Sequence, residues 1–218
     1  MMKIHRMYLV PVLAGMAMLW VPIAQAQGDG ATDEQVSAGL VVQFPGAGDF
    51  DVYDMGVGLE FQYRRWYGLG GLGLSLGLEQ WSTNSSTRNW SEFRRDERAR
   101  LSGDLNMVPV GLSGLGRWPI QDGLQLRGEA GLRYVWVDPD MMLQRAGWEQ
   151  SESVRLNDGW VVLAGVGVEQ LLTDTLMFTA DLRYQHDLVR ARARVPSAKL
   201  MSNHLRSFGI KLGLQLWF

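Results

Sequence analysis

The end of the chain alternates between two kinds of side chain. From Phe208 to Phe218 every even position is apolar, whereas glycine, lysine and glutamine occupy the odd positions as far as Gln215. A period of two residues places successive side chains on opposite faces of a β-strand. The chain therefore ends in a strand with one apolar face and one polar face.

The same alternation recurs along the chain and predicts eight strands in all. Between the apolar positions lie mainly Gly, Ser, Gln and charged residues. In the fourth strand Asp104 and Asn106 indicate one register, whereas Val110 and Leu112 indicate the other. A bulge near Pro109, which has no N–H to donate, would reconcile the two. The predicted strands cover residues 35–44, 55–63, 72–81, about 101–118, 124–136, 159–170, 176–186 and 207–218.

The connections between these strands alternate in length. Residues 67–71, 119–123 and 171–175 form tight turns, whereas 45–54, 82–100, 138–157 and 188–203 are longer and polar. An even number of strands with short turns at one end and long loops at the other is typical of transmembrane β-barrels. A soluble β-sandwich gives no reason for this alternation. The predicted fold is an all-β, eight-stranded antiparallel transmembrane β-barrel with short periplasmic turns and long extracellular loops.

The first residues have the pattern of an export signal. Lys3 and Arg6 precede an apolar run from Met7 to Ile23, which an Ala-Gln-Ala sequence follows. A membrane anchor is the alternative, but this run is at the short limit for a spanning helix, and the small residues indicate cleavage after Ala26 by the secretory route. We therefore expect a signal peptide at 1–26, a short periplasmic segment at 27–34 and the barrel at 35–218.

The polar face of the predicted strands carries both signs of charge. A soluble core would have to desolvate these ions at a cost of several kcal/mol each. An eight-stranded barrel is only wide enough inside for side chains, so we expect opposite charges to pair there and close the interior. The predicted internal network consists of Glu60, Arg64, Glu79, Arg127, Glu129, Arg133, Glu169, Asp181, Arg183 and Lys211.

Composition excludes several kinds of site. The chain has no cysteine and a formal net charge of -2, which excludes disulfides and thiolate metal sites and gives no basic bias towards nucleic acid. The glycines from Gly68 to Gly73 fit a dinucleotide fingerprint, but a strand follows them where that motif needs a helix. We expect no cofactor, no metal ion and no nucleic-acid partner.

Together, the strand number, loop pattern and terminal Phe218 resemble the small outer-membrane barrels of the outer membrane protein A transmembrane domain and outer membrane protein X. The last strand is similar to the C-terminal assembly signal of such barrels, which implies recognition by the barrel-assembly machinery through Ile210, Leu212, Leu214, Leu216 and Phe218. The resemblance implies an outer-membrane location. Aromatic residues near the strand ends fit the interfacial belts of this class: Trp66, Tyr67, Trp118 and Phe218 on the turn side, and Tyr134, Trp136, Trp160 and Tyr184 on the loop side.

The long loops carry the remaining signal. Arg190, Arg192, Arg194 and Lys199 lie in the fourth long loop with no acidic residue between them. Guanidinium groups suit phosphate, and the outer leaflet presents lipopolysaccharide phosphates. We therefore expect a monomeric barrel with a structural or surface-interaction role, surrounded by outer-membrane lipid, whose basic loop contacts lipopolysaccharide.

Two alternatives remain at this point. Lipid A-modifying barrel enzymes share the architecture, and His186, Asp187 and His204 flank the last loop, but the Ser two residues after the His of the deacylase pattern is missing after His204. No catalytic residue is assigned on this basis. The other alternative is a narrow channel for small solutes.

Overall fold

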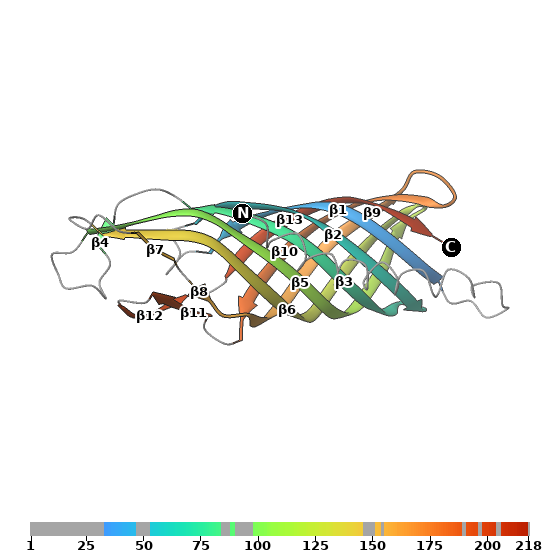
Figure 1. Ribbon diagram of the computed structural model, residues 1–218. Helices are drawn as coiled ribbons and strands as arrows, with labels where there is room; N and C mark the ends of the chain where they lie inside the picture. Colours follow the sequence, from blue (N-terminus) through green and yellow to red (C-terminus); the bar gives the residue numbers. More distant parts are fainter. Residues whose placement is uncertain are drawn as a thin grey trace, which may run out of the picture.

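The computed structural model describes residues 33–46, 53–83, 88–89, 98–145, 151–153, 155–188, 191–195, 198–203 and 206–217. Eight long strands form one closed antiparallel barrel, which confirms the predicted fold (Figure 1). These strands are β1 (Asp33–Pro45), β2 (Tyr53–Tyr67), β3 (Gly70–Thr83), β5 (Arg98–Gln121), β6 (Leu124–Arg145), β9 (Gly159–Leu171), β10 (Leu176–Asp187) and β13 (Ser207–Trp217).

The first and last strands close the barrel. β1 pairs with β13 along nearly its whole length, from Gln35 opposite Trp217 to Pro45 opposite Ser207. Each of the other long strands pairs with its two sequence neighbours among the long strands. No helix in the described part of the chain has the length and apolarity needed to cross a membrane.

β5 and β6 are much longer than the other strands, with 24 and 22 residues. Their ladder keeps one register from Pro119 opposite Gln125 to Ala99 opposite Arg145, with an irregularity only beside the tight turn, so the hairpin extends beyond the rest of the barrel (Figure 1). The prediction that 138–157 is a loop is therefore wrong for residues 138–145. The other long strands have 11 to 15 residues and end close to the predicted positions.

In the described parts of the long loops there are five short strands. β4 (Arg88–Asn89) pairs with β5, and β7 (Ser151–Ser153) pairs with β6. β8 (Arg155–Leu156), β11 (Ala191–Val195) and β12 (Ala198–Asn203) form a separate three-stranded sheet in the order β12-β11-β8. Two loops that are distant in the sequence therefore meet in one sheet.

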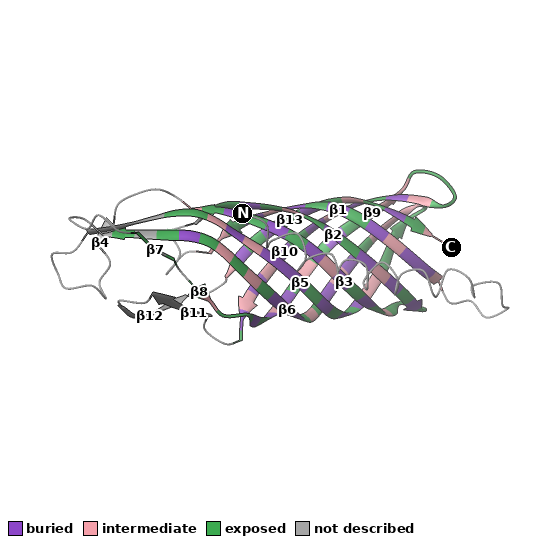
Figure 2. Ribbon diagram, viewed as in Figure 1, coloured by how far each residue is buried: buried purple, intermediate pink, exposed green. Residues whose placement is uncertain are grey.

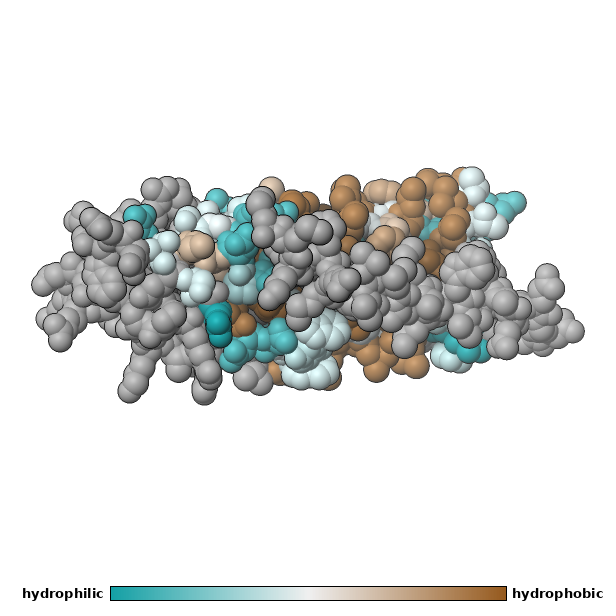
Figure 3. All heavy atoms as spheres, viewed as in Figure 1, coloured by the Kyte–Doolittle hydropathy of each residue, from teal (hydrophilic) through white to brown (hydrophobic). Residues whose placement is uncertain are grey.

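Burial alternates along the barrel strands (Figure 2). In β3, for example, Leu72, Leu74 and Leu78 are exposed, whereas Ser75 and Glu79 are buried. The apolar side chains therefore face outward and the polar side chains face the interior. On the surface, apolar residues gather over one part of the barrel wall, and hydrophilic residues lie beyond it (Figure 3). This is the side-chain pattern of a barrel wall that contacts lipid.

The pattern inverts where β5 and β6 extend above the barrel. In the lower part of β5, Val110 and Leu112 face outward and Ser113 is buried, but in the upper part Leu105 and Met107 are buried. The pairing of β5 with β6 shows no register shift over this part of the strands. The bulge that we predicted near Pro109 is therefore wrong: the strand continues in register, and the environment changes from lipid outside to water outside.

Pro109 nevertheless interrupts the ladder on its other side. β3 pairs with β5 at Leu76 opposite Val110 and again at Glu79 opposite Met107, with the same offset, but the two intervening pairs are missing. Because Pro109 remains paired with Val135 of β6, its nitrogen lies on the β3 side, where a proline cannot donate. One short section of the wall therefore lacks backbone hydrogen bonds.

Candidate functional site

The ten charged residues of the predicted network are all buried in the barrel. They come from β2, β3, β6, β9, β10 and β13, whose alternation directs every second side chain inward. Buried ions lose hydration and need partners of opposite charge. Apart from Glu79, their contacts centre on Glu60 and on Glu169, and Arg183 lies 3.7 Å from Asp181 between the two groups.

Three cations converge on Glu60. Arg133 donates to its carboxylate at 2.5 Å, Arg183 at 2.7 Å and Lys211 at 2.8 Å. Arg183 also reaches Glu129 at 3.0 Å. These residues belong to four separate strands, so the ion pairs cross the interior instead of running along the wall.

The second cluster lies nearer the short turns. Glu169 accepts from Arg64 at 2.6 Å and lies 3.2 Å from Arg127, which also pairs with Asp181. Arg64 donates further to the amide oxygen of Gln62 at 2.7 and 3.0 Å. Charged and amide groups thus fill the cross-section at this level.

Trp66 closes the interior below this cluster. It is fully buried, and its indole nitrogen donates to Gln35 at 2.7 Å. Arg117 lies 4.8 Å from its ring centroid and pairs with Asp33 at 2.6 Å. Our assignment of Trp66 to the interfacial belt is therefore wrong. Its even number gives it the inward parity of Arg64, a signal that sequence reasoning missed.

The other predicted belt residues are distributed as follows. Tyr67 and Trp118 are exposed at the turn end, and Trp136 and Trp160 at the loop end. Tyr134 packs edge to face against both of these tryptophans, with ring centroids 5.1 Å apart. Tyr184 is half-buried, and Phe218 lies outside the described residues.

Glu79 differs from the rest of the network. It is buried and accepts a hydrogen bond of 2.7 Å from the amide of Gln43, to which Ser207 donates at 2.6 Å. None of the ion pairs among the described residues includes Glu79. Sequence reasoning placed this carboxylate inside, but its partner is an amide of β1, which reaches it across β2.

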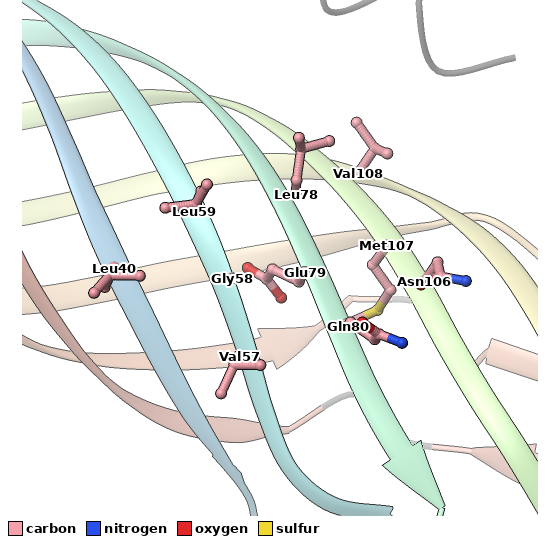
Figure 4. A pocket seen from close by; sticks show the side chains of 10 residues that line it. All are labelled: Leu40, Val57, Gly58, Leu59, Leu78, Glu79, Gln80, Asn106, Met107 and Val108. Carbon is pink, nitrogen blue, oxygen red and sulfur yellow. The ribbon is translucent and has the colours of Figure 1, made fainter. Parts of the chain in front are cut away.

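A groove on the outer wall lies beside Pro109, where two pairs of the β3–β5 ladder are missing. It is lined by the outward-facing Leu40, Val57 and Leu59 together with the buried Glu79 and Met107 (Figure 4). Because its lining includes residues of both faces, the groove extends into the wall at the level where two pairs of the β3–β5 ladder are missing.

The predicted basic loop lies partly in the separate sheet. Arg192 and Arg194 belong to β11 and Lys199 to β12, whereas Arg190 lies outside the described residues. The pairing also places Arg155 of β8 opposite Arg194. Sequence reasoning missed Arg155 because it lies in a different loop, and no local pattern indicates that two loops pair.

The predicted assembly signal and histidines are placed as follows. Ile210, Leu212, Leu214 and Leu216 of β13 all face outward and are exposed. His186 lies with its Nδ1 3.1 Å from the hydroxyl of Tyr184. His204 lies outside the described residues. Within the described ranges, no group of three or more His, Cys, Asp or Glu side chains could hold a metal ion.

Part of the chain matches a known protein family. Residues 86–210 match the family described as the OmpA-like transmembrane domain. No curated protein sequence gave a significant match.

Three solved structures show the same fold. Outer membrane protein OprG from Pseudomonas aeruginosa is 17% identical, with a TM-score of 0.60 over 88% of this chain and 98% of that chain. Outer membrane protein AlkL, determined in DMPC lipid bilayers, is 15% identical, with a TM-score of 0.54 over 89% and 93% of the two chains. A major outer membrane protein from Thermus thermophilus is 13% identical, with a TM-score of 0.52 over 87% and 100%.

Proposed function

Because the chain belongs to the OmpA-like transmembrane domain family and is an outer-membrane β-barrel, we propose that it acts as a closed anchor for a surface-interaction site, without a wide pore. The ion pairs that cross the interior carry this proposal. Glu60, Arg133, Arg183 and Lys211 come from separate strands and meet in the lumen. A solute would have to break these contacts to pass.

Conductance in planar lipid bilayers tests the closed interior. We expect no sustained conductance from the wild type. A double variant, Glu60→Ala with Arg183→Ala, keeps the internal charge balanced but removes side-chain volume, so it is expected to conduct. Leu112→Ala, on the outer face, is the matched control and is expected to remain closed. A sustained large conductance of the wild type would overturn the proposal.

The proposed partners are outer-membrane lipid, lipopolysaccharide and the barrel-assembly machinery. The exposed apolar row of β13 supports recognition by that machinery, since these four side chains are accessible from outside the barrel. Deleting Phe218 is expected to lower the amount of heat-modifiable, folded barrel in the outer membrane. An unchanged amount would argue against this role. We also propose that the barrel is a monomer with no catalytic function.

One observation favours a second candidate, lateral passage of small apolar molecules. The groove beside Pro109 joins outward-facing Leu78 to buried Met107, where the β3–β5 ladder is interrupted. Above this level the interior is lined by apolar residues such as Leu105 and Met141. Pro109→Val, which supplies a backbone N–H, is expected to slow uptake of a small apolar dye by intact cells. Equal uptake by variant and wild type would exclude this candidate.

A further inference from the structure

The separate sheet concentrates positive charge at one place. Its three strands, β8, β11 and β12, contain three arginines and one lysine and no acidic residue. β8 comes from the loop between β6 and β9, and the other two come from the loop between β10 and β13. The fold therefore brings together cations that are about 40 residues apart in the sequence.

The register places two of these arginines directly opposite each other. Arg194 of β11 pairs with Arg155 of β8, and Arg192 shares the face of Arg194 because it lies two residues before it. Like charges at opposite positions of antiparallel strands destabilise the pair. A sheet that places Arg155 opposite Arg194 is therefore stabilised when an anion lies between them.

An irregularity in the sheet adds a fourth cation. Ala193 pairs with Met201 but Val195 pairs with Ala198, so two residues of β12, Lys199 and Leu200, lie opposite Arg194 alone. Lys199 thus lies at the register position of the arginine pair.

The sheet lies close to the outer membrane surface. Arg155 precedes the exposed Trp160 by five residues, and the amide of Leu188, which precedes β11, donates to the carbonyl of Trp160 at 2.9 Å. At about 3.3 Å per residue, Arg155 is within about 17 Å of the aromatic belt along the chain. β8 also contacts β6, whose extension supports the sheet. The cations are therefore within reach of the headgroup layer, which begins at the aromatic belt.

We propose that the β8–β11–β12 sheet is a phosphate-binding site for an outer-leaflet lipid, with one phosphorylated headgroup bound between Arg155 and Arg194. The inference rests on the proposed contact of the fourth long loop with lipopolysaccharide and extends it to the third long loop. A guanidinium group can donate two parallel hydrogen bonds to one phosphate. Arginines at opposite register positions supply two positive charges that one phosphate can neutralise.

Lipid binding by the full mature barrel tests this site. The protein is folded into phospholipid nanodiscs that contain either diphosphorylated lipid A or the same lipid without phosphates, and the lipid retained after exchange is measured by mass spectrometry. Arg155→Gln is expected to reduce the retained diphosphorylated lipid about tenfold. The double variant with Arg194→Gln is expected to lose little more, because both residues hold one phosphate. Arg155→Lys keeps the charge but removes the guanidinium group with its two parallel donors, so the amount of retained diphosphorylated lipid is expected to be intermediate.

Arg65→Gln is the matched control, since it removes one exposed arginine from the turn end of the barrel and is expected to bind as the wild type does. Heat-modifiable migration shows that each variant is folded. Equal retention of the lipid with and without phosphates, or unchanged retention by Arg155→Gln, would overturn the proposal. Displacement of the lipid by millimolar inorganic phosphate would overturn its assignment to a lipid headgroup.

This test is independent of bilayer conductance, which addresses the closed interior. If Arg192→Gln reduced retention but Arg155→Gln and Arg194→Gln did not, the loop contact with lipopolysaccharide would stand and the two-loop site would fail. The two proposals can therefore be distinguished.

Discussion

Replacing Glu60 with glutamine tests the energetic role of the internal network. The carboxylate is almost completely buried and accepts from Arg133, Arg183 and Lys211 at 2.5 to 2.8 Å. Glutamine preserves its size but removes its charge. Arg183 retains Glu129 as a partner, but Arg133 and Lys211 have no other ion-pair partner among the described residues. Removing one member of a buried ion pair costs about 3–5 kcal/mol.

The matched control is Glu79→Gln. Glu79 is also a buried carboxylate, but it accepts a hydrogen bond from Gln43, which the amide oxygen of glutamine can accept as well. The free energy of unfolding of Glu79→Gln should be about 1 kcal/mol lower than that of the wild type, which is the difference between a charged and a neutral hydrogen bond. Glu60→Gln is thus expected to unfold at a lower urea concentration than Glu79→Gln when each is folded in lipid vesicles and followed by tryptophan fluorescence.

Equal stability of the two variants would refute the view that Glu60 compensates buried cations. A double variant separates charge from packing. Combining Glu60→Gln with Lys211→Met removes the ammonium group that the single change leaves without its carboxylate, so we expect it to be more stable than Glu60→Gln alone. If it is less stable, loss of packing explains the effect.

Three other experiments test the wall and the export signal. A Cβ atom at Gly77 would lie 2.7 Å from Pro109 Cγ, so Gly77→Ala is expected to lower stability by about 1–3 kcal/mol, whereas Gly159→Ala, with no atom within 4 Å of the new Cβ, serves as control; equal stability would contradict this packing. Pro109→Val is expected to add a slowly exchanging amide in hydrogen exchange and to raise the free energy of unfolding by about 0.5–1.5 kcal/mol. A rapidly exchanging amide at this position would show that the backbone hydrogen bond between β3 and β5 does not form. Mass spectrometry of the exported protein is expected to show a chain beginning after Ala26, and a retained leader would contradict the cleavage prediction.

The strand number, the fold class and the facing of most barrel residues could be predicted from the sequence because each follows from local alternation. Arg64 and Leu74, for example, follow directly from the parity of their strands. The ends of β5 and β6 could not be found this way. Above Pro109 the polar residues face outward and the apolar residues face inward. If apolar residues are assumed to face outward along the whole strand, this alternation therefore wrongly predicts a change of register.

Partner choice depended on contacts that no local pattern contains. The pairing of Glu79 with Gln43 requires β3 and β1 to face each other across β2, and the approach of Arg155 to Arg194 requires two loops to pair. Trp66 shows the reverse case. Its even position in β2 indicated an inward-facing side chain, whereas tryptophan as a residue type favoured the membrane interface. In the structure the position in the alternation determines where the side chain lies.

The inversion along β5 and β6 bears on where the protein acts. Above Met107 the hairpin buries Leu105 and Met141 and exposes Ser102 and Asp140, although Met142 is also exposed, and this is mainly the arrangement of a water-exposed structure. Part of its β6 edge is also covered. β9 begins only at Gly159, but Asp158 accepts a hydrogen bond from the Val137 amide at 2.9 Å and β7 pairs with residues 142–144. A covered edge does not recruit another strand.

The extension therefore serves as a support for the loops instead of as a surface for strand addition. It holds β8 beside β6 and so fixes one side of the basic sheet. Below it, the ion pairs of the lumen fix the ends of the strands from which the loops emerge. At the proposed phosphate site, the backbone positions of Arg155 and Arg194 are thus set before a ligand binds, which lowers the entropy lost on binding. Loosening this support by removing the Asp158 contact, as in Asp158→Ala, should weaken lipid retention without changing any cation, and unchanged retention would show that the sheet positions itself independently of β6.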